Sequence, residues 1–125
     1  MSHHILVVDD EPSVRGVVEA VLFADGFDVT TVRDGEEALD AMEERLPDAV
    51  VLDLMMPAMT GWEVLDEIRR DPRHQHSRVP VLVLTAKATD WDRDRTTAAD
   101  HFMSKPFEPD ELVQTLTRLI AAKAS

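Results

Sequence analysis

Three unbroken runs of aliphatic residues most constrain what this chain can fold into. The runs are Ile5–Val8, Ala49–Leu52 and Val81–Leu84, and none of them alternates apolar with polar residues. Strands with one face in water show that alternation, whereas continuous Val/Leu/Ile runs are typical of strands covered on both faces. The sequence therefore predicts an α/β fold built around a parallel sheet.

Two further strands are expected at Asp28–Val32 and at His101–Met103. Between the strands, apolar residues recur at helical spacing and helix-start signals precede them. The expected helix starts are Pro12, Asp34-Gly-Glu-Glu37, Thr60-Gly-Trp-Glu63 and Pro109. The alternation of strands with helices indicates right-handed β-α-β connections.

The first helix is expected to end near Gly26 and to bury one apolar stripe, formed by Val14, Val17, Val18, Val21 and Leu22. The polar stretch 71–78 is expected to be an exposed loop. The stretch Ala88–Ala99 has only one large apolar residue, Trp91, so we expect it to be short or irregular.

Composition limits the function classes. The 125 residues suit a single domain spanning 1–125, and the absence of cysteine excludes disulfides and thiolate chemistry. We find no apolar run that would span a membrane or serve as a signal peptide, so a cytoplasmic protein without membrane contact is expected. The net charge of −12 leads us to expect no direct nucleic-acid binding.

Polar side chains follow four of the expected strands. Asp9 and Asp10 come after the first, Asp53 after the third, Thr85 after the fourth and Lys105 after the fifth. Ligand sites of parallel α/β sheets lie outside the carboxyl ends of the strands. We therefore expect these five side chains to converge at one edge of the sheet.

This set of side chains points to phosphoryl chemistry. Three crowded carboxylates resist ionising together unless a cation lies among them. Mg²⁺ takes oxygen ligands and is commonly shared with a phosphate. Lys105 would offer charge to an anion, and an aspartate can act as the nucleophile that forms an aspartyl phosphate.

Four motifs in the chain resemble the receiver domain of two-component response regulators. They are Asp9-Asp10-Glu11-Pro12, Val51-Leu52-Asp53-Leu54-Met55-Met56-Pro57, Leu84-Thr85-Ala86 and Ser104-Lys105-Pro106-Phe107. Their order and approximate spacing match over essentially the whole chain. The resemblance implies a flavodoxin-like, doubly wound five-stranded parallel sheet in the order 2-1-3-4-5.

The resemblance also implies a role for each site residue. Asp53 corresponds to the phosphoacceptor. Asp9, Asp10, Asp53 and the backbone carbonyl of Met55 correspond to the Mg²⁺ ligands. Thr85 corresponds to the switch hydroxyl and Phe102 to the switch aromatic. Lys105 corresponds to the family's phosphate-neutralising lysine, and the Lys105-Pro106 bond is expected to be cis.

The implied function is a phosphoacceptor switch that takes a phosphoryl group from a histidine kinase or phosphotransfer protein. The chain is expected to catalyse only its own phosphorylation and dephosphorylation, and so not to be an enzyme with a separate substrate. We expect it to act on a downstream protein of unknown identity, without an output domain, or as a relay intermediate. A homodimer is left open.

The region before the last strand departs from the family pattern. The interval from Thr85 to Lys105 is about two residues short, and Ala98-Ala99-Asp100-His101-Phe102 stands where the family has Gly-Ala-Asp-Asp-Tyr. We therefore expect an atypical fourth-helix region.

Three alternatives to the phosphoacceptor switch are weighed. A pseudo-receiver that works without phosphorylation is the main one. An aspartate-nucleophile phosphatase would need a second acid where Met55 stands. A flavin carrier would need a phosphate loop where the sequence has Asp9-Asp10-Glu11.

Overall fold

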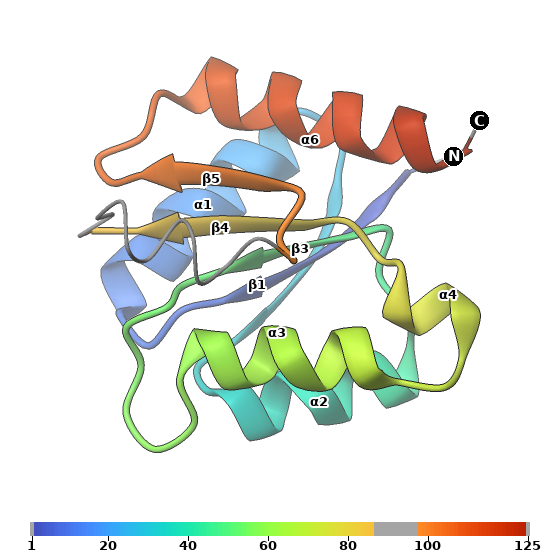
Figure 1. Ribbon diagram of the computed structural model, residues 1–125. Coiled ribbons are helices and arrows are strands. Elements are labelled where there is room, and N and C mark those ends of the chain that lie inside the picture. The colour runs from blue at the N-terminus through green and yellow to red at the C-terminus, as the bar shows by residue number, and fades with distance from the viewer. Residues whose placement is uncertain (1, 87–97, 125) are drawn as a thin grey trace.

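A computed structural model describes residues 2–86 and 98–124, and its centre is a five-stranded sheet (Figure 1). The strands are β1 (His4–Val8), β2 (Asp28–Val32), β3 (Ala49–Leu52), β4 (Val81–Thr85) and β5 (His101–Ser104). Their order is β2-β1-β3-β4-β5, and each neighbouring pair is parallel. The flavodoxin-like order 2-1-3-4-5 is confirmed, and each strand agrees with its expected bounds to within one residue.

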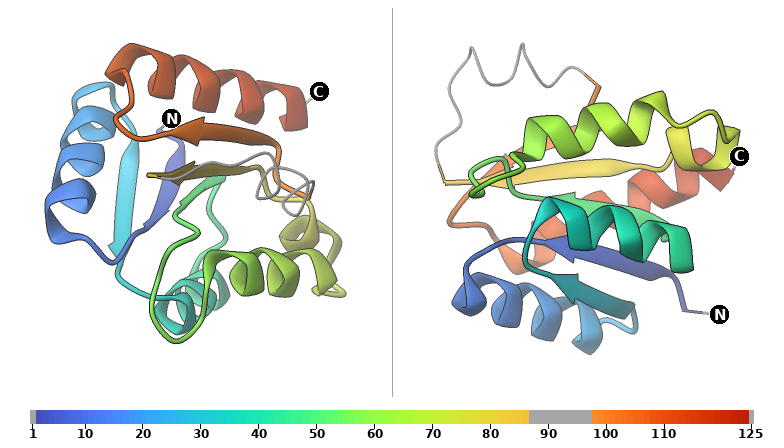
Figure 2. Two further views of the ribbon diagram at one scale, coloured as in Figure 1. Left: turned by 60° about the vertical axis from the view of Figure 1, so that its left-hand side comes forward. Right: turned by 90° about the horizontal axis from the view of Figure 1, so that it is seen from below.

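Helices cover both faces of the sheet. The helices are α1 (Pro12–Ala24), α2 (Gly35–Glu44), α3 (Gly61–Arg70), the short α4 (His74–Ser77) and α6 (Pro109–Ala124). In all views α1 and α6 lie on one side of the sheet, whereas α2 and α3 lie on the other (Figures 1 and 2). Within the described residues, no helix is long and apolar enough to cross a membrane.

The central strand β1 explains why the aliphatic runs are continuous. Ile5 and Val7 belong to the apolar core beneath α1 and α6, whereas Leu6 and Val8 belong to the core beneath α2 and α3. All four side chains are at most 1% exposed. Burying alternate residues on opposite faces leaves no position for a polar side chain within the run Ile5–Val8.

Side-chain caps fix where α2 and α3 begin. Thr60 and Glu63 form the predicted reciprocal capping box at the start of α3. At the start of α2, Asp34 accepts a hydrogen bond from the Glu37 N–H, but the Glu37 carboxylate accepts from the Arg33 N–H. Both helices therefore begin where the sequence predicts.

Two details differ from the sequence-based expectations, and one expectation falls largely on residues that the structure does not describe. Val17 is 54% exposed, although Val18 and Leu22 of the same predicted stripe are buried. The stretch 71–78, predicted as a loop, contains the one-turn helix α4. Of the atypical fourth-helix region, only residues 98 and 99 are described, so Trp91 and the expectation for Ala88–Ala99 lie outside the described residues.

Candidate functional site

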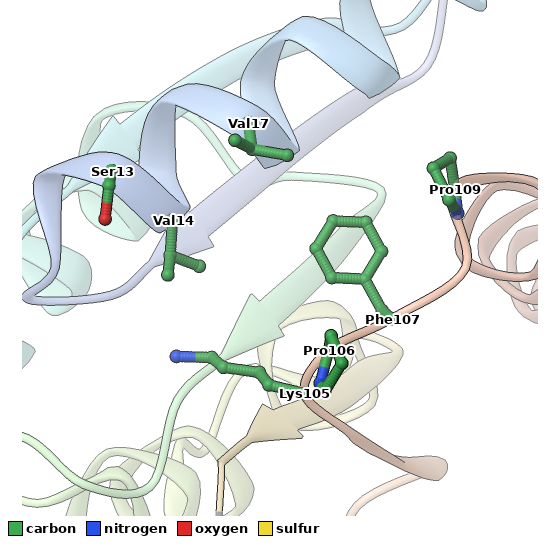
Figure 3. Close-up of a pocket in the computed structure, with 7 residues that line it drawn as sticks. All are labelled: Ser13, Val14, Val17, Lys105, Pro106, Phe107 and Pro109. Atoms are coloured by element: carbon green, nitrogen blue, oxygen red, sulfur yellow. The ribbon is translucent and has the colours of Figure 1, made fainter.

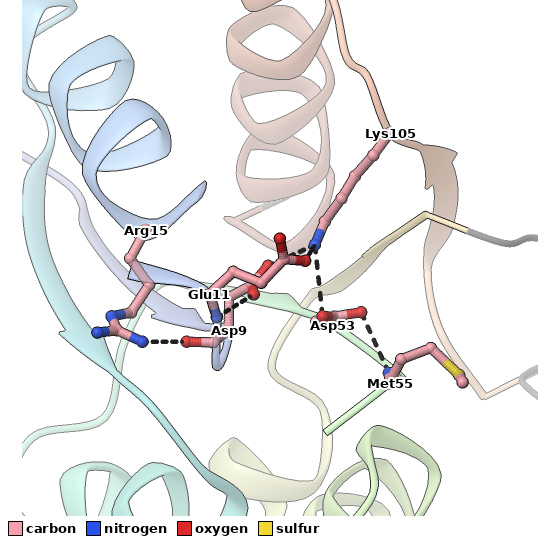
Figure 4. Close-up of polar contacts among 6 residues, drawn as sticks. All are labelled: Asp9, Glu11, Arg15, Asp53, Met55 and Lys105. Carbon is pink, nitrogen blue, oxygen red and sulfur yellow. Dashed lines mark hydrogen bonds and ion pairs between the residues drawn. The ribbon is translucent and has the colours of Figure 1, made fainter. Parts of the chain in front are cut away.

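The expected convergence of polar side chains occurs at the carboxyl edge of the sheet (Figure 4). Asp9 follows β1, Asp53 follows β3, Thr85 ends β4 and Lys105 follows β5. Asp10 comes next to Asp9 in the turn between β1 and α1. Strand order alone places these positions together, because β1, β3, β4 and β5 are consecutive neighbours in the sheet.

Three carboxylates form the centre of the site. Asp9, Asp10 and Asp53 each offer an oxygen, and these oxygens all lie within 4.8 Å of one another. Asp9 and Asp53 are each only 3% exposed, whereas Asp10 is accessible to solvent. This is the only cluster of three or more such ligands among the residues that the structure describes.

The environment of Asp53 opposes its ionisation. Burial raises the pKa of this carboxyl above its usual value, and the charge of Asp9 raises it further. Two groups favour the charged form without offsetting the rise. The Met55 N–H donates to Oδ1 over 3.1 Å, and the Lys105 ammonium lies 3.4 Å from Oδ2.

Lys105 is the cation of the site. Its Nζ donates to Asp9 Oδ2 over 2.8 Å, and it lies 3.4 Å from both Glu11 Oε1 and Asp53 Oδ2 (Figure 4). Burial alone would lower its pKa, but the three carboxylates outweigh burial and hold the pKa of Lys105 above its usual value. The ammonium group therefore stays charged.

Thr85 presents a buried hydroxyl that can form further hydrogen bonds. Its side chain is fully buried, and its Oγ1 makes no hydrogen bond with any residue in the described part of the chain. A buried hydroxyl left without a partner costs free energy of about 1–3 kcal/mol. Such a group is suited to a ligand that brings an acceptor oxygen into the site.

Close backbone packing holds Asp53 in place. The Asp53 N–H donates to the Val8 carbonyl over 3.0 Å, and the Gly61 N–H donates to the Leu54 carbonyl over 3.1 Å. Gly61, the first residue of α3, packs so tightly here that an added Cβ would lie 2.3 Å from the Asp53 carbonyl oxygen. A side chain at position 61 would therefore displace the strand end that carries Asp53.

An apolar groove of about 390 Å³ lies beside the acidic cluster, between the start of α1 and the segment that joins β5 to α6 (Figure 3). Its lining residues are Ser13, Val14, Val17, Lys105, Pro106, Phe107 and Pro109. Lys105 belongs to both features, since its chain lines the groove while its ammonium reaches the carboxylates. The exposure of Val17 is explained by its position in the wall of this groove.

The structure places the remaining expected residues as follows. The Lys105-Pro106 bond is cis, as the resemblance implies. Met55 is 56% exposed and contacts Asp53 through its N–H, while the role of its carbonyl as a metal ligand stays a prediction. Phe102 lies on β5, half-buried against the core beneath α2 and α3, and its switching role also stays a prediction.

Two contacts of the site were not anticipated from the sequence. Arg15 donates from Nη1 to the Asp9 carbonyl oxygen over 2.7 Å, and Glu11 is a third carboxylate partner of Lys105. Arg15 is four residues after Glu11, so helical periodicity alone would have placed both side chains on one face beside the acidic turn.

Comparison with known proteins identifies the class. The model of the "Response regulator receiver domain" family matches residues 5–117. The chain therefore belongs to the response regulator receiver domains, which are signalling modules of two-component systems.

Particular relatives are similar over most of this chain. The DNA-binding response regulator MtrA of Mycolicibacterium smegmatis is 44% identical over 90% of this chain and 48% of its own length. The alkaline phosphatase synthesis transcriptional regulatory protein PhoP of Bacillus subtilis is 42% identical over 90% of this chain and 46% of its own length. The chain thus spans about half the length of these curated relatives.

A solved structure is similar along almost its whole length. The receiver domain of the sensor histidine kinase PA1611 from Pseudomonas aeruginosa is 35% identical, with a TM-score of 0.88, over 97% of this chain and 99% of that chain. That structure has a magnesium ion coordinated in its active site cleft.

The expectation of no direct nucleic-acid binding is wrong as a statement about the protein's class. Relatives with more than 40% identity include proteins named as DNA-binding response regulators or transcriptional regulators. The net charge of −12 belongs only to these 125 residues. Charge on one segment cannot exclude nucleic-acid binding by the rest of a longer protein, and the expectation of signalling without an output domain loses its basis for the same reason.

Proposed function

We propose that this receiver accepts a phosphoryl group on Asp53 from the phosphohistidine of a histidine kinase or phosphotransfer protein. The observation that carries the proposal is the convergence of Asp53, two further carboxylates, a buried hydroxyl and a charged lysine at one edge of the sheet. The pseudo-receiver alternative gives no reason for these groups to converge.

The residues present fit Mg²⁺. The carboxylates of Asp9, Asp10 and Asp53 are hard oxygen donors, and their oxygens are close enough to share one small ion. We propose that these three carboxylates, with the Met55 carbonyl, hold the ion. When bound, Mg²⁺ would neutralise charge on the phosphoryl oxygens and keep the carboxylates ionised.

In the proposed step, an oxygen of the ionised Asp53 carboxylate forms a bond to phosphorus as the phosphorus–nitrogen bond to histidine breaks. The donor imidazole leaves with the electron pair of that bond. Lys105 stays protonated and interacts with the transferred anion, and the Thr85 hydroxyl donates to one of its oxygens. The chemistry requires mainly positioning and charge neutralisation, which this set of side chains supplies.

The switch that follows is proposed to start at Thr85. The buried hydroxyl lacks a hydrogen-bond partner among the described residues, so an arriving phosphoryl oxygen would draw it closer to Asp53. Phe102, on the strand next to β4, would then move inward and change the surface around β5.

The downstream process that we propose is control of transcription through a DNA-binding effector, as the names of MtrA and PhoP suggest. The proposed compartment is the cytoplasm, where ATP is available to supply the kinase.

Intact mass spectrometry tests the proposal. The chain is incubated with Mg²⁺ and a small acyl phosphate, and separately with a phosphorylated kinase. We expect a gain of one phosphoryl group that requires Mg²⁺ and is lost in Asp53→Asn but kept in Asp66→Asn, an exposed aspartate on α3. No gain from either donor would favour the pseudo-receiver.

A further inference from the structure

The β1–α1 turn, which carries Asp9 and Asp10, is held by a residue outside the metal-ligand set. Arg15 projects from α1 back over this turn, and its Nη1 donates to the Asp9 carbonyl oxygen over 2.7 Å (Figure 4). A guanidinium–carbonyl hydrogen bond of this length is a short, charge-assisted one.

The turn before α1 is held without a side-chain cap on the helix. Glu11 is the N-cap residue of α1, but no side chain caps the helix there. Instead, three hydrogen bonds converge on Asp9. Its N–H donates to the Val32 carbonyl, its Oδ1 accepts from the Glu11 N–H, and its carbonyl accepts from Arg15. With Lys105 on Oδ2, every polar group of Asp9 has a partner.

Asp10 is in the opposite situation. Its side chain is accessible and makes no hydrogen bond or ion pair within the part of the chain that the structure describes. The backbone on either side of Asp10 therefore decides where its carboxylate lies. Freedom of that backbone would have to be lost when a cation binds, which would weaken binding.

We propose that Arg15 is a positioning residue for the Mg²⁺ site: by holding the Asp9 carbonyl, it keeps the turn in the conformation that directs Asp10 toward the cation. This inference rests on the function proposed above, because it assumes that Asp9, Asp10 and Asp53 hold the ion.

The direction in which Mg²⁺ affinity changes when Arg15 is replaced separates a positioning role from other roles. If Arg15 acted only through its positive charge, its removal would strengthen Mg²⁺ binding, because a like charge would leave the neighbourhood of the cation. If Arg15 only stabilised α1, its removal would lower the free energy of unfolding and leave Mg²⁺ affinity of the folded protein unchanged. Positioning alone predicts weaker binding.

The test is calorimetric titration of the 125-residue chain with MgCl₂, with folding checked by urea unfolding. We expect Arg15→Gln to raise the Mg²⁺ Kd about tenfold, as is typical for loss of a group that orients a metal ligand. Arg15→Lys keeps the charge and part of the reach, so we expect a smaller rise, roughly threefold. Arg33→Gln removes an equal charge from an exposed arginine paired with Glu37, and should leave the Kd unchanged.

A second readout needs no metal. In the absence of Mg²⁺, Arg15→Gln should shift the backbone amide signals of residues 9–11 in the ¹H–¹⁵N spectrum, and Arg33→Gln should not. Arg15 variants that are folded and bind Mg²⁺ as tightly as the wild type, or more tightly, would overturn the inference and leave the proposed function standing. Wild-type protein that does not bind Mg²⁺ would overturn both.

Discussion

The ammonium group of Lys105 lies closer to Asp9 than to Asp53, at 2.8 Å from Asp9 Oδ2 and 3.4 Å from Asp53 Oδ2. Asp53 is the proposed acceptor, whereas Asp9 is a proposed metal ligand. A metal ion bound there would compete with the lysine for the Asp9 carboxylate. In the proposed reaction the same lysine interacts with the phosphoryl group on Asp53, so its contact with Asp9 would have to loosen.

Lys105→Met should separate these two roles. Methionine keeps the length of the chain along the groove but removes the charge, so Mg²⁺ should bind more tightly, by about tenfold, because one positive charge leaves the acidic cluster. Phosphorylation by an acyl phosphate should nevertheless slow by about a hundredfold, since the phosphoryl oxygens lose a counter-charge. Calorimetry and intact mass measure the two effects, and weaker Mg²⁺ binding in this variant would contradict the competition.

The raised pKa of Asp53 predicts a pH-dependent gain in stability for Asp53→Asn. A pKa raised by folding means that this group stabilises the native state fully below its ordinary pKa of 3.8, and that this stabilisation is lost as pH rises through the folded value. Asparagine has no such loss. In EDTA at pH 7, we therefore expect Asp53→Asn to have a larger free energy of unfolding than the wild type, and the difference should shrink as pH falls toward 3.8.

Urea unfolding across this pH range checks the prediction. Asp66→Asn, on the exposed surface of α3, is the control for the general loss of one negative charge and should change stability by less than about 0.5 kcal/mol. A lower stability of Asp53→Asn at pH 7 would mean that attraction to Lys105 outweighs burial and repulsion by Asp9.

Thr85→Val should stabilise the fold and impair the switch. Valine has nearly the same shape but no hydroxyl, so it removes a buried polar group that lacks a partner among the described residues. We expect a gain of about 1 kcal/mol in the free energy of unfolding. Asp53 should still be phosphorylated, but the amide spectrum of the phosphorylated form should show smaller shifts along β4 and β5 than in the wild type.

Thr117→Val provides the control, because this exposed hydroxyl donates to the Val113 carbonyl within α6. It should change stability by less than about 0.5 kcal/mol and leave the shifts unaltered. Full-sized shifts in Thr85→Val would contradict the proposed role of the hydroxyl.

The strands and the location of the site were predictable because each depends on a short-range pattern. Runs such as Ile5–Val8 have no tolerance for polar residues when both faces are buried, so their sequence identifies them directly. Parallel strands then bring the residues that follow them to one edge, so Asp53 and Lys105 meet although 51 residues separate them. The residue types indicate phosphoryl chemistry, whereas the assignment of Asp53 as the acceptor comes from the family resemblance.

Other features depend on contacts that the sequence does not encode locally. Helical periodicity places Val17 beside Val18, but whether it is covered depends on how closely Phe107 approaches α1, and the structure leaves a groove there. Helical periodicity places Arg15 near the acidic turn, but nothing in the sequence indicates that its guanidinium donates to a backbone carbonyl. Helix α4 escaped prediction because a single turn with polar residues has no apolar stripe.

Gly61 provides the sharpest test of how the fold positions Asp53. An added Cβ at this residue would lie 2.3 Å from the Asp53 carbonyl oxygen and 2.6 Å from the Leu54 Cα, and both are backbone atoms that cannot rotate away. We therefore expect Gly61→Ala to destabilise the fold by about 3 kcal/mol and to slow phosphorylation of Asp53 in the fraction that remains folded. Gly16→Ala is the matched control, since a Cβ there meets nothing within 4 Å, in the middle of α1. It should stabilise the protein by about 0.5–1 kcal/mol through helix propensity alone. Urea unfolding of both variants decides the matter, and equal stability of the two would show that the contact between α3 and the end of β3 is not tight.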